Sequence, residues 1–285
     1  MYRALNGKLL NYVVQGEGMP VVLIHGMAAS LYDWENLLPV LSGAGFRAYA
    51  VDLLGHGDSQ KPVDPRMYTH RALLATLEGW LGSLEIDQPF MLVGHSLGGH
   101  LSLSYSLRHP NKVCALVLID PFYSLKQLPP IFRLLHRRPS PGVKILGALP
   151  ENLIERVMRF DLTTLARLSS QVRRQIAADL KRASPNILHI PRSLPDLTHE
   201  LSHIQVPAQV IWGEDDLTLN PASFPRLVSI LSNASGHPIS NCGHQPHVGK
   251  PEQVNRLVVE FLAAVNAQGL NSKSGLPKDA TWSSN

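Results

Sequence analysis

Residues 92–99 read LVGHSLGG, with Ser96 between Gly94 and Gly98, after the apolar run PFMLV and before the helix-like LGGHLSLSY. This order predicts a buried strand, a sharp turn and a helix. Glycine has no Cβ, so the two glycines permit a turn that is too tight for other residues. Such a turn holds the Ser96 hydroxyl above the carboxyl edge of a sheet, where the free N–H groups of a helix N-terminus favour negative charge. Ser96 is therefore a candidate nucleophile as well as a small residue in a turn.

Strand and helix patterns alternate on both sides of this stretch. The apolar runs are typical of strands covered on both faces, and the segments between them carry apolar residues at helical spacing. Serial strand-helix units imply right-handed crossovers into a parallel sheet wrapped by helices, so the predicted fold class is α/β. The Asn6-Gly7 pair predicts a β-hairpin at the N-terminus. The expected buried strands are 21–26, 46–52, 90–94, 113–120 and 206–213, and the expected helices are 33–42, 69–84, 97–109, 221–231 and 251–265.

The middle of the chain differs from its surroundings. Between residues 121 and 201 the buried-strand pattern is absent, prolines are frequent, and 151–160 and 163–183 are amphipathic helix patterns. This predicts a helical cap, residues 121–201, inserted between two parts of one core, residues 1–120 and 202–266. The polar, glycine-containing end of the chain, residues 267–285, is expected to be disordered.

The composition is that of a soluble globular protein. The 285 residues contain neither an N-terminal apolar run of signal-peptide length nor about 18 consecutive apolar residues for a membrane span, so a cytoplasmic location is expected. The two cysteines, Cys114 and Cys242, support neither a disulfide framework nor a CxxC metal site. The net charge of +4 lacks the interleaved basic and aromatic pattern of nucleic-acid binders, so no nucleic-acid partner is expected.

A serine nucleophile needs a base that takes its proton and a third group that orients the base. The segment NCGHQPH, residues 241–247, places His244 on a loop after the expected last strand and before the last helix, and His247 follows three residues later. The segment IWGEDD places Asp215 and Asp216 directly after a buried strand. Both segments fall at the same carboxyl edge of the sheet as Ser96. The order of the strands thus supplies a base and an acid, with two candidates for each.

Five segments taken in order, LIHGMAAS, DLLGHGDS, GHSLGG, WGEDD and GHQPHVGKPE, resemble the α/β-hydrolase fold superfamily, and within it the capped, lipase- and esterase-like serine hydrolases. The resemblance covers roughly residues 10–266. It implies a mostly parallel, eight-stranded-type sheet with the cap after the sixth strand. It selects Asp216 as the acid, His244 as the base, and the backbone N–H groups of Met27 and Leu97 as the oxyanion donors. It implies neither a metal nor an organic cofactor.

Other residues compete for these roles. Asp215 remains an alternative acid, and His247 an alternative base, although His247 falls where the chain approaches the last helix. His95 and His100 flank the nucleophile and are expected to pack or to orient other groups. His56, in the glycine-rich GHGDS, is expected to shape a loop.

The charge of the insertion bears on the substrate. Residues 122–200 carry 13 Lys and Arg against 6 Asp and Glu, a net charge of +7, with basic clusters at 136–138 and 172–174. This charge suits an anionic substrate or peripheral contact with an anionic lipid surface, but a solvated helix face is the simpler explanation for it. The apolar residues at the start of the cap are compatible with an acyl pocket or with ordinary packing; they are Phe122, Tyr123, Phe132 and Leu135.

The expected function is hydrolysis of carboxylic esters, either small or with acyl chains, by a Ser-His-Asp triad and an acyl-enzyme. A serine nucleophile excludes the family members that use aspartate. The same triad also serves C–C bond hydrolases of the meta-cleavage type, lactonases, thioesterases and perhydrolases, of which the C–C hydrolases are the second candidate. A small-molecule receptor is the alternative from another class, and the complete triad argues against it. The sequence leaves the oligomeric state open.

Overall fold

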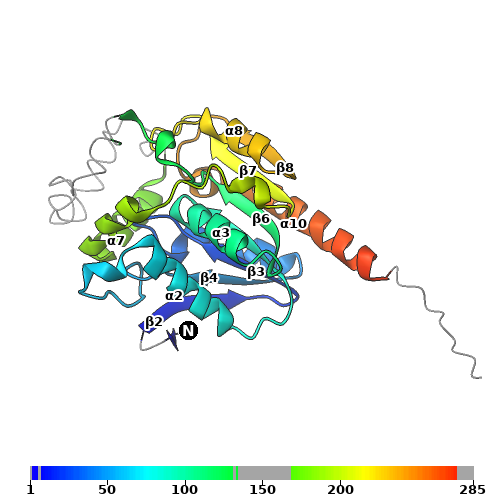
Figure 1. Cartoon of the computed structure of the whole chain (residues 1–285), viewed down its shortest axis with the longest axis horizontal. Coiled ribbons are helices and arrows are strands. Elements are labelled where there is room, and N and C mark those ends of the chain that lie inside the picture. Colours follow the sequence, from blue (N-terminus) through cyan, green and yellow to red (C-terminus); the bar gives the residue numbers. More distant parts are fainter. Residues whose placement is uncertain (1, 6–7, 131–132, 134–167, 275–285) are drawn as a thin grey trace, which may run out of the picture.

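The computed structural model of the chain describes residues 2–5, 8–130, 133 and 168–274. Eight strands form one sheet in the order β1-β2-β4-β3-β5-β6-β7-β8 (Figure 1). Neighbouring strands are antiparallel in the pairs β1/β2 and β2/β4 and parallel in all other pairs, which confirms the α/β fold class. The strands are β1 (Tyr2–Leu5), β2 (Lys8–Gln15), β3 (Met19–Ile24), β4 (Phe46–Val51), β5 (Phe90–His95), β6 (Val113–Ile119), β7 (Ala208–Gly213) and β8 (Ala234–Ile239).

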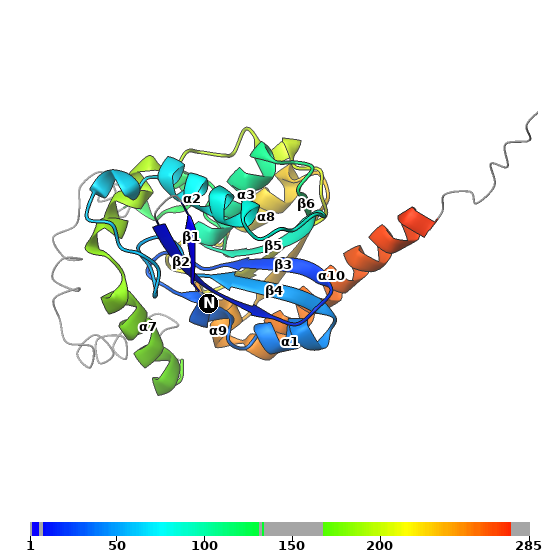
Figure 2. The ribbon, with the colours of Figure 1, turned by 90° about the horizontal axis from the view of Figure 1, so that it is seen from below.

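Helices cover both faces of the sheet, as Figure 2 shows. Side chains alternate along β3, so Val22 and Ile24 join one buried apolar cluster while Val21 and Leu23 join the other. A strand buried on both faces is a continuous apolar run, which is why the sequence pattern found it. The helices on the first face are α2 (His70–Gly82), α3 (Leu97–Arg108) and α8 (Ser223–Ile230), and those on the second are α1 (Leu38–Gly43) and α10 (Pro251–Ser274).

The helix predicted for residues 33–42 is wrong in its first half. A short 3₁₀ helix, η1 (Leu31–Trp34), comes first, and α1 starts only at Leu38. Proline has no N–H and is tolerated only in the first turn of a helix. Pro39 occupies that turn, so the helix cannot extend further toward the N-terminus.

The C-terminal part agrees with the prediction in one place and departs from it in another. The last strand expected before His244 is the edge strand β8, whose segment is polar in sequence because an edge strand exposes much of its surface and tolerates Pro238. The last helix continues through 267–274, for which the sequence predicts disorder. No proline interrupts these residues, and Gly269 costs the helix only about 1 kcal/mol. Residues 275–285 lie outside the described part.

The described residues of the insertion, 121–130, 133 and 168–201, contain no strand. The helix α7 starts where the Ser169 hydroxyl accepts the N–H of Val172, within the helix predicted for 163–183. The predicted helix 151–160 lies outside the described residues, and the division into core and cap stays a prediction. The described helices here are η3 (Leu125–Gln127), α7 (Ser170–Arg182), η5 (Pro185–Ser193) and η6 (Leu201–His203).

The described helices also bear on membrane association. None of them combines the length and the apolar character needed to span a bilayer.

Candidate active site

Ser96 lies in the sharp turn between β5 and α3. Its backbone has φ 48° and ψ −108°, a conformation that costs a residue with a Cβ about 1–3 kcal/mol. Two hydrogen bonds hold the turn: the Ser96 N–H donates to the carbonyl of Ile119 (3.0 Å), and the Ser96 carbonyl accepts the N–H of Phe122 (3.1 Å). A Cβ on Gly98 would overlap the carbonyl oxygen of Ile24, so this close approach requires glycine.

Two further loops at the carboxyl edge of the sheet bring a base and an acid to this serine. His244 follows β8, and its Nε2 lies 2.9 Å from the Ser96 hydroxyl oxygen. Asp216 follows β7, and its Oδ2 lies 2.7 Å from Nδ1 of His244. A carboxylate only accepts, so Nδ1 carries the proton and Nε2 is free to accept the proton of the serine hydroxyl. This is the arrangement of a nucleophile, a general base and an orienting acid.

The carboxylate of Asp216 is held in its ionised form. Burial opposes ionisation, but the charge and hydrogen bond of His244 and the N–H groups of Leu219 and Thr218 outweigh it and lower the pKa of Asp216. Those two N–H groups lie 3.0 and 2.7 Å from Oδ1. Both oxygens are therefore fixed, and the acid is rigid enough to orient the imidazole.

The two expected oxyanion donors flank the same turn. Leu97 is the first residue of α3, so its N–H is one of those that a helix leaves without an internal acceptor. Met27 lies on the loop after β3. The ring of His25 fixes that loop, because its Nδ1–H donates to the Gly26 carbonyl (2.7 Å) and its Nε2 accepts the N–H of Leu53 (3.0 Å).

The competing residues occupy other places. Asp216 and not Asp215 bonds to His244; Asp215 is exposed, and its N–H donates to the Cys242 carbonyl. His56 and His100 are buried, and desolvation lowers the pKa of each to about 3, so both rings are neutral packing groups. His95 and His247, also buried, gather around a different carboxylate from that of the triad.

Asp120 is a buried carboxyl that the sequence analysis did not single out. It follows β6, and one of its oxygens lies within 4.8 Å of both an Asp216 oxygen and a ring nitrogen of His244. Burial, and then the charge of Asp216, raise the pKa of Asp120 well above its usual value. Two adjacent buried carboxyls repel each other when both are ionised, so the neutral form of Asp120, which can donate toward Asp216, is favoured. The sequence contained a sign of this role, because Asp120 directly follows the buried strand β6, much as Asp216 follows β7 by three residues.

This arrangement makes Asp120 a positioning residue with a testable effect. Asp120→Asn keeps a donor toward Asp216 and is expected to retain most of kcat, whereas Asp120→Ala removes the donor. The alanine variant is expected to lower kcat about 10- to 100-fold at unchanged KM, the usual cost of losing a group that orients a catalytic residue. Steady-state kinetics, with thermal unfolding as the check on folding, measure both. Equal kcat in the two variants would contradict the role.

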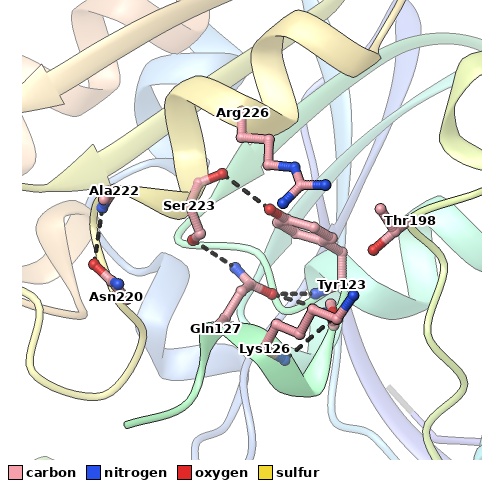
Figure 3. A pocket seen from close by; sticks show the side chains of 9 residues that line it. Tyr123, Lys126, Gln127, Thr198, Asn220, Ala222, Ser223 and Arg226 are labelled. Atoms are coloured by element: carbon pink, nitrogen blue, oxygen red, sulfur yellow. Dashed lines mark hydrogen bonds between the residues drawn. The ribbon is translucent and has the colours of Figure 1, made fainter.

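A cavity of about 200 Å³ lies between the start of the insertion and α8 (Figure 3). Lys126 and Arg226 reach it, and neither side chain makes an ion pair with the described residues. Gln127 anchors its wall by donating to the Ser223 hydroxyl (3.2 Å). Lys126 and Arg226 give this hollow a positive charge that suits a carboxylate or another small anion, and the carboxylate of Asp196 offsets part of the charge of Lys126. The wall consists of Tyr123, Ser124, Lys126, Gln127, Thr198, Asn220, Ala222, Ser223 and Arg226.

The apolar residues at the start of the insertion divide into two groups. Phe122 packs beside the ring of His100 in the core, whereas Tyr123, although buried, donates its hydroxyl to the Ser223 carbonyl and lines the cavity. Phe132 and Leu135 lie outside the described residues.

Comparisons with known proteins agree with this fold. The family model of the α/β-hydrolase fold matches residues 19–141. A 2-hydroxy-6-oxononadienedioate/2-hydroxy-6-oxononatrienedioate hydrolase of Burkholderia vietnamiensis is 32% identical over 259 residues, 85% of this chain and 86% of the relative. The monoacylglycerol lipase ABHD6 of Mus musculus is 25% identical over 271 residues, 88% of this chain and 77% of the relative. The structure of an esterase from Thermogutta terrifontis aligns with a TM-score of 0.77 at 23% identity, covering 93% of this chain and 97% of that one.

Proposed function

Because this chain is a hydrolase that belongs to the α/β-hydrolase fold family, we propose that Ser96, His244 and Asp216 are its catalytic triad and that it hydrolyses carboxylic esters. One observation carries the proposal: the hydrogen-bonded chain from Asp216 to His244 (2.7 Å) and from His244 to the Ser96 hydroxyl (2.9 Å). A serine with its proton already directed to an oriented imidazole is poised for attack on a carbonyl.

The reaction runs in two steps. Nε2 of His244 accepts the hydroxyl proton as Ser96 Oγ bonds to the ester carbonyl, and the tetrahedral oxyanion accepts hydrogen bonds from the N–H groups of Met27 and Leu97. The imidazolium returns its proton to the leaving alkoxide, which departs as the alcohol. Water then attacks the acyl-enzyme, giving its proton to His244, and the acid leaves as Ser96 recovers its hydroxyl hydrogen. Asp216 stabilises the imidazolium in both steps.

Esters are the preferred substrate class because the triad, the two oxyanion donors and water suffice for the whole catalytic cycle. A C–C substrate has a carbon leaving group, which needs protonation at carbon and a means of stabilising its electron pair. Of the described residues, the further acid near His244 is Asp120, and its carboxyl lies beside Asp216, with no contact to Ser96 among the hydrogen bonds of the site. Hydrolysis of an ester is therefore the chemistry that the described site supports with the fewest additional groups.

Hydrolytic C–C cleavage is the second candidate, and two observations favour it. The relative from Burkholderia vietnamiensis is named for a 2-hydroxy-6-oxo dienedioate or trienedioate, a substrate with two carboxylates. The cavity beside Lys126 and Arg226 has the charge to bind one carboxylate of such a molecule.

A substrate panel separates the two candidates. Purified protein is assayed with p-nitrophenyl esters of two to twelve acyl carbons and with 2-hydroxy-6-oxonona-2,4-dienedioate, and kcat/KM is compared within one preparation. We expect the best ester to exceed the dienedioate in kcat/KM by at least tenfold. The reverse order would make C–C hydrolysis the function. Absence of turnover with every compound, together with ligand binding that Ser96→Ala leaves unchanged, would favour a receptor.

A further inference from the structure

A second cluster of ligating side chains lies next to the triad and takes no part in it. Asp33 of η1, His95 at the end of β5 and His247 of the short helix α9 (Pro246–Gly249) converge in the interior. Asp33 Oδ2 lies 3.8 Å from Nδ1 of His95 and 3.6 Å from Nε2 of His247. The three side chains are 7%, 3% and 1% exposed.

All three of these atoms are buried without a hydrogen-bond partner among the described residues. A buried polar atom left unpaired costs about 1–3 kcal/mol, and an ionised carboxylate costs more. No Lys or Arg of the described residues pairs with Asp33. The cluster therefore lacks a positive centre that would bind its carboxylate.

The tautomer of His95 also indicates that this ring does not donate a hydrogen bond to Asp33. Its Nε2 lies 2.7 Å from the carbonyl oxygen of His244, and a carbonyl only accepts, so the ring proton is on Nε2. Nδ1 then presents a lone pair toward Asp33. Two acceptors thus face each other across 3.8 Å.

We propose that Asp33, His95 and His247 bind a divalent transition-metal ion, with Zn²⁺ as the ion that their chemistry fits best. Two imidazoles and one carboxylate form a donor set that such ions prefer, with a further position left for water. The hydrogen bond from His95 to the His244 carbonyl is the outer contact that commonly fixes a ligating imidazole.

The spacing distinguishes a metal from a water molecule. Bonds of about 2.0–2.1 Å to a tetrahedral Zn²⁺ place ligand atoms about 3.4 Å apart. A water hydrogen-bonded to the same atoms at about 2.8 Å would place them about 4.6 Å apart. The two separations from Asp33, 3.6 and 3.8 Å, are closer to the metal value, and the two ring nitrogens lie within 4.8 Å of each other.

The site would join η1 to two segments that also carry the triad. His95 precedes Ser96, and His247 lies three residues beyond His244. The rings of Trp34 and His95 lie against the ring of His247, with centroids 4.9 and 4.5 Å away, and fix its orientation. Metal binding is therefore expected to stabilise the folded protein, because the unfolded chain does not hold these ligands together.

The test uses the full chain without an affinity tag, so that no added histidines bind metal. Metal content is measured by mass spectrometry, and Zn²⁺ affinity of the chelator-treated protein is measured by competition with a chromophoric chelator. We expect about one Zn²⁺ per chain, a Tm raised by several degrees on adding Zn²⁺, and visible absorption bands with Co²⁺.

Three variants locate the site. Asp33→Asn and His247→Gln are expected to lower the Zn²⁺ affinity at least tenfold and to abolish the Co²⁺ bands. His203→Gln, which replaces an exposed histidine of η6, is the matched control and is expected to bind as the wild type does. Circular dichroism verifies that each variant is folded. Wild-type protein that binds Zn²⁺ no more tightly than Asp33→Asn would overturn the proposal.

Discussion

Ser96→Ala is expected to lower kcat for the best ester by about 10⁶-fold while KM changes little. The variant loses the atom that carries the acyl group, whereas the substrate pocket and the oxyanion donors remain. Both esterase assays and labelling by a fluorophosphonate probe measure this, since the probe reacts only with an activated serine. Ser106→Ala is the matched control, because Ser106 is another buried serine of α3 and its hydroxyl donates only to the Ser102 carbonyl. Near wild-type turnover by Ser96→Ala would contradict the assignment.

The strain at the same residue predicts a second consequence. Ser96 has a φ of 48°, which glycine adopts without the penalty that a Cβ brings. Ser96→Gly is therefore expected to be as inactive as the alanine variant and yet more stable, by about 1 kcal/mol, which raises Tm by about 2 °C. A glycine variant that is less stable than Ser96→Ala would show that the turn is not strained.

The fold could be predicted where a physical rule acts locally. Strands covered on both faces must be apolar at every position, so β3 to β7 were evident as runs of apolar residues. The edge strand β8 escapes that rule because it faces solvent, and Ser235 and Pro238 do not resemble a core strand. The start of α1 could have been predicted from Pro39, which is tolerated only in the first turn of a helix. The helical spacing of the apolar residues before it suggested an earlier start.

The site could be predicted in part because its three loops all follow strands. Once Ser96 is placed at the carboxyl edge of the sheet, acids and histidines after later strands have to lie near it. The cluster of Asp33, His95 and His247 has no such signal, since its members lie more than 60 residues apart and only the packed fold unites them. Asp120 did carry a signal, a carboxyl ending a buried strand, but its proximity to Asp216 depends on the pairing of β6 with β7.

Asp216→Asn is expected to lower kcat about 10⁴-fold, equivalent to about 5.5 kcal/mol of transition-state stabilisation. The amide has nearly the shape of the carboxylate, so the fold is kept and the N–H groups of Thr218 and Leu219 still find an oxygen. The amide nitrogen toward His244, however, donates where the carboxylate accepts, which favours the tautomer with the proton on Nε2. That tautomer cannot take the proton of Ser96, and the imidazolium loses its counter-charge.

Asp215→Asn is the control that distinguishes the two adjacent acids. Asp215 is exposed and does not bond to His244, so its replacement removes one surface charge and is expected to leave kcat/KM unchanged. The two variants have the same composition and the same net charge, so any difference between them arises from position alone. A large loss in Asp215→Asn with little loss in Asp216→Asn would assign the acid to Asp215. It would also require the loop after β7 to rearrange during catalysis, because only Asp216 reaches the imidazole in the present structure.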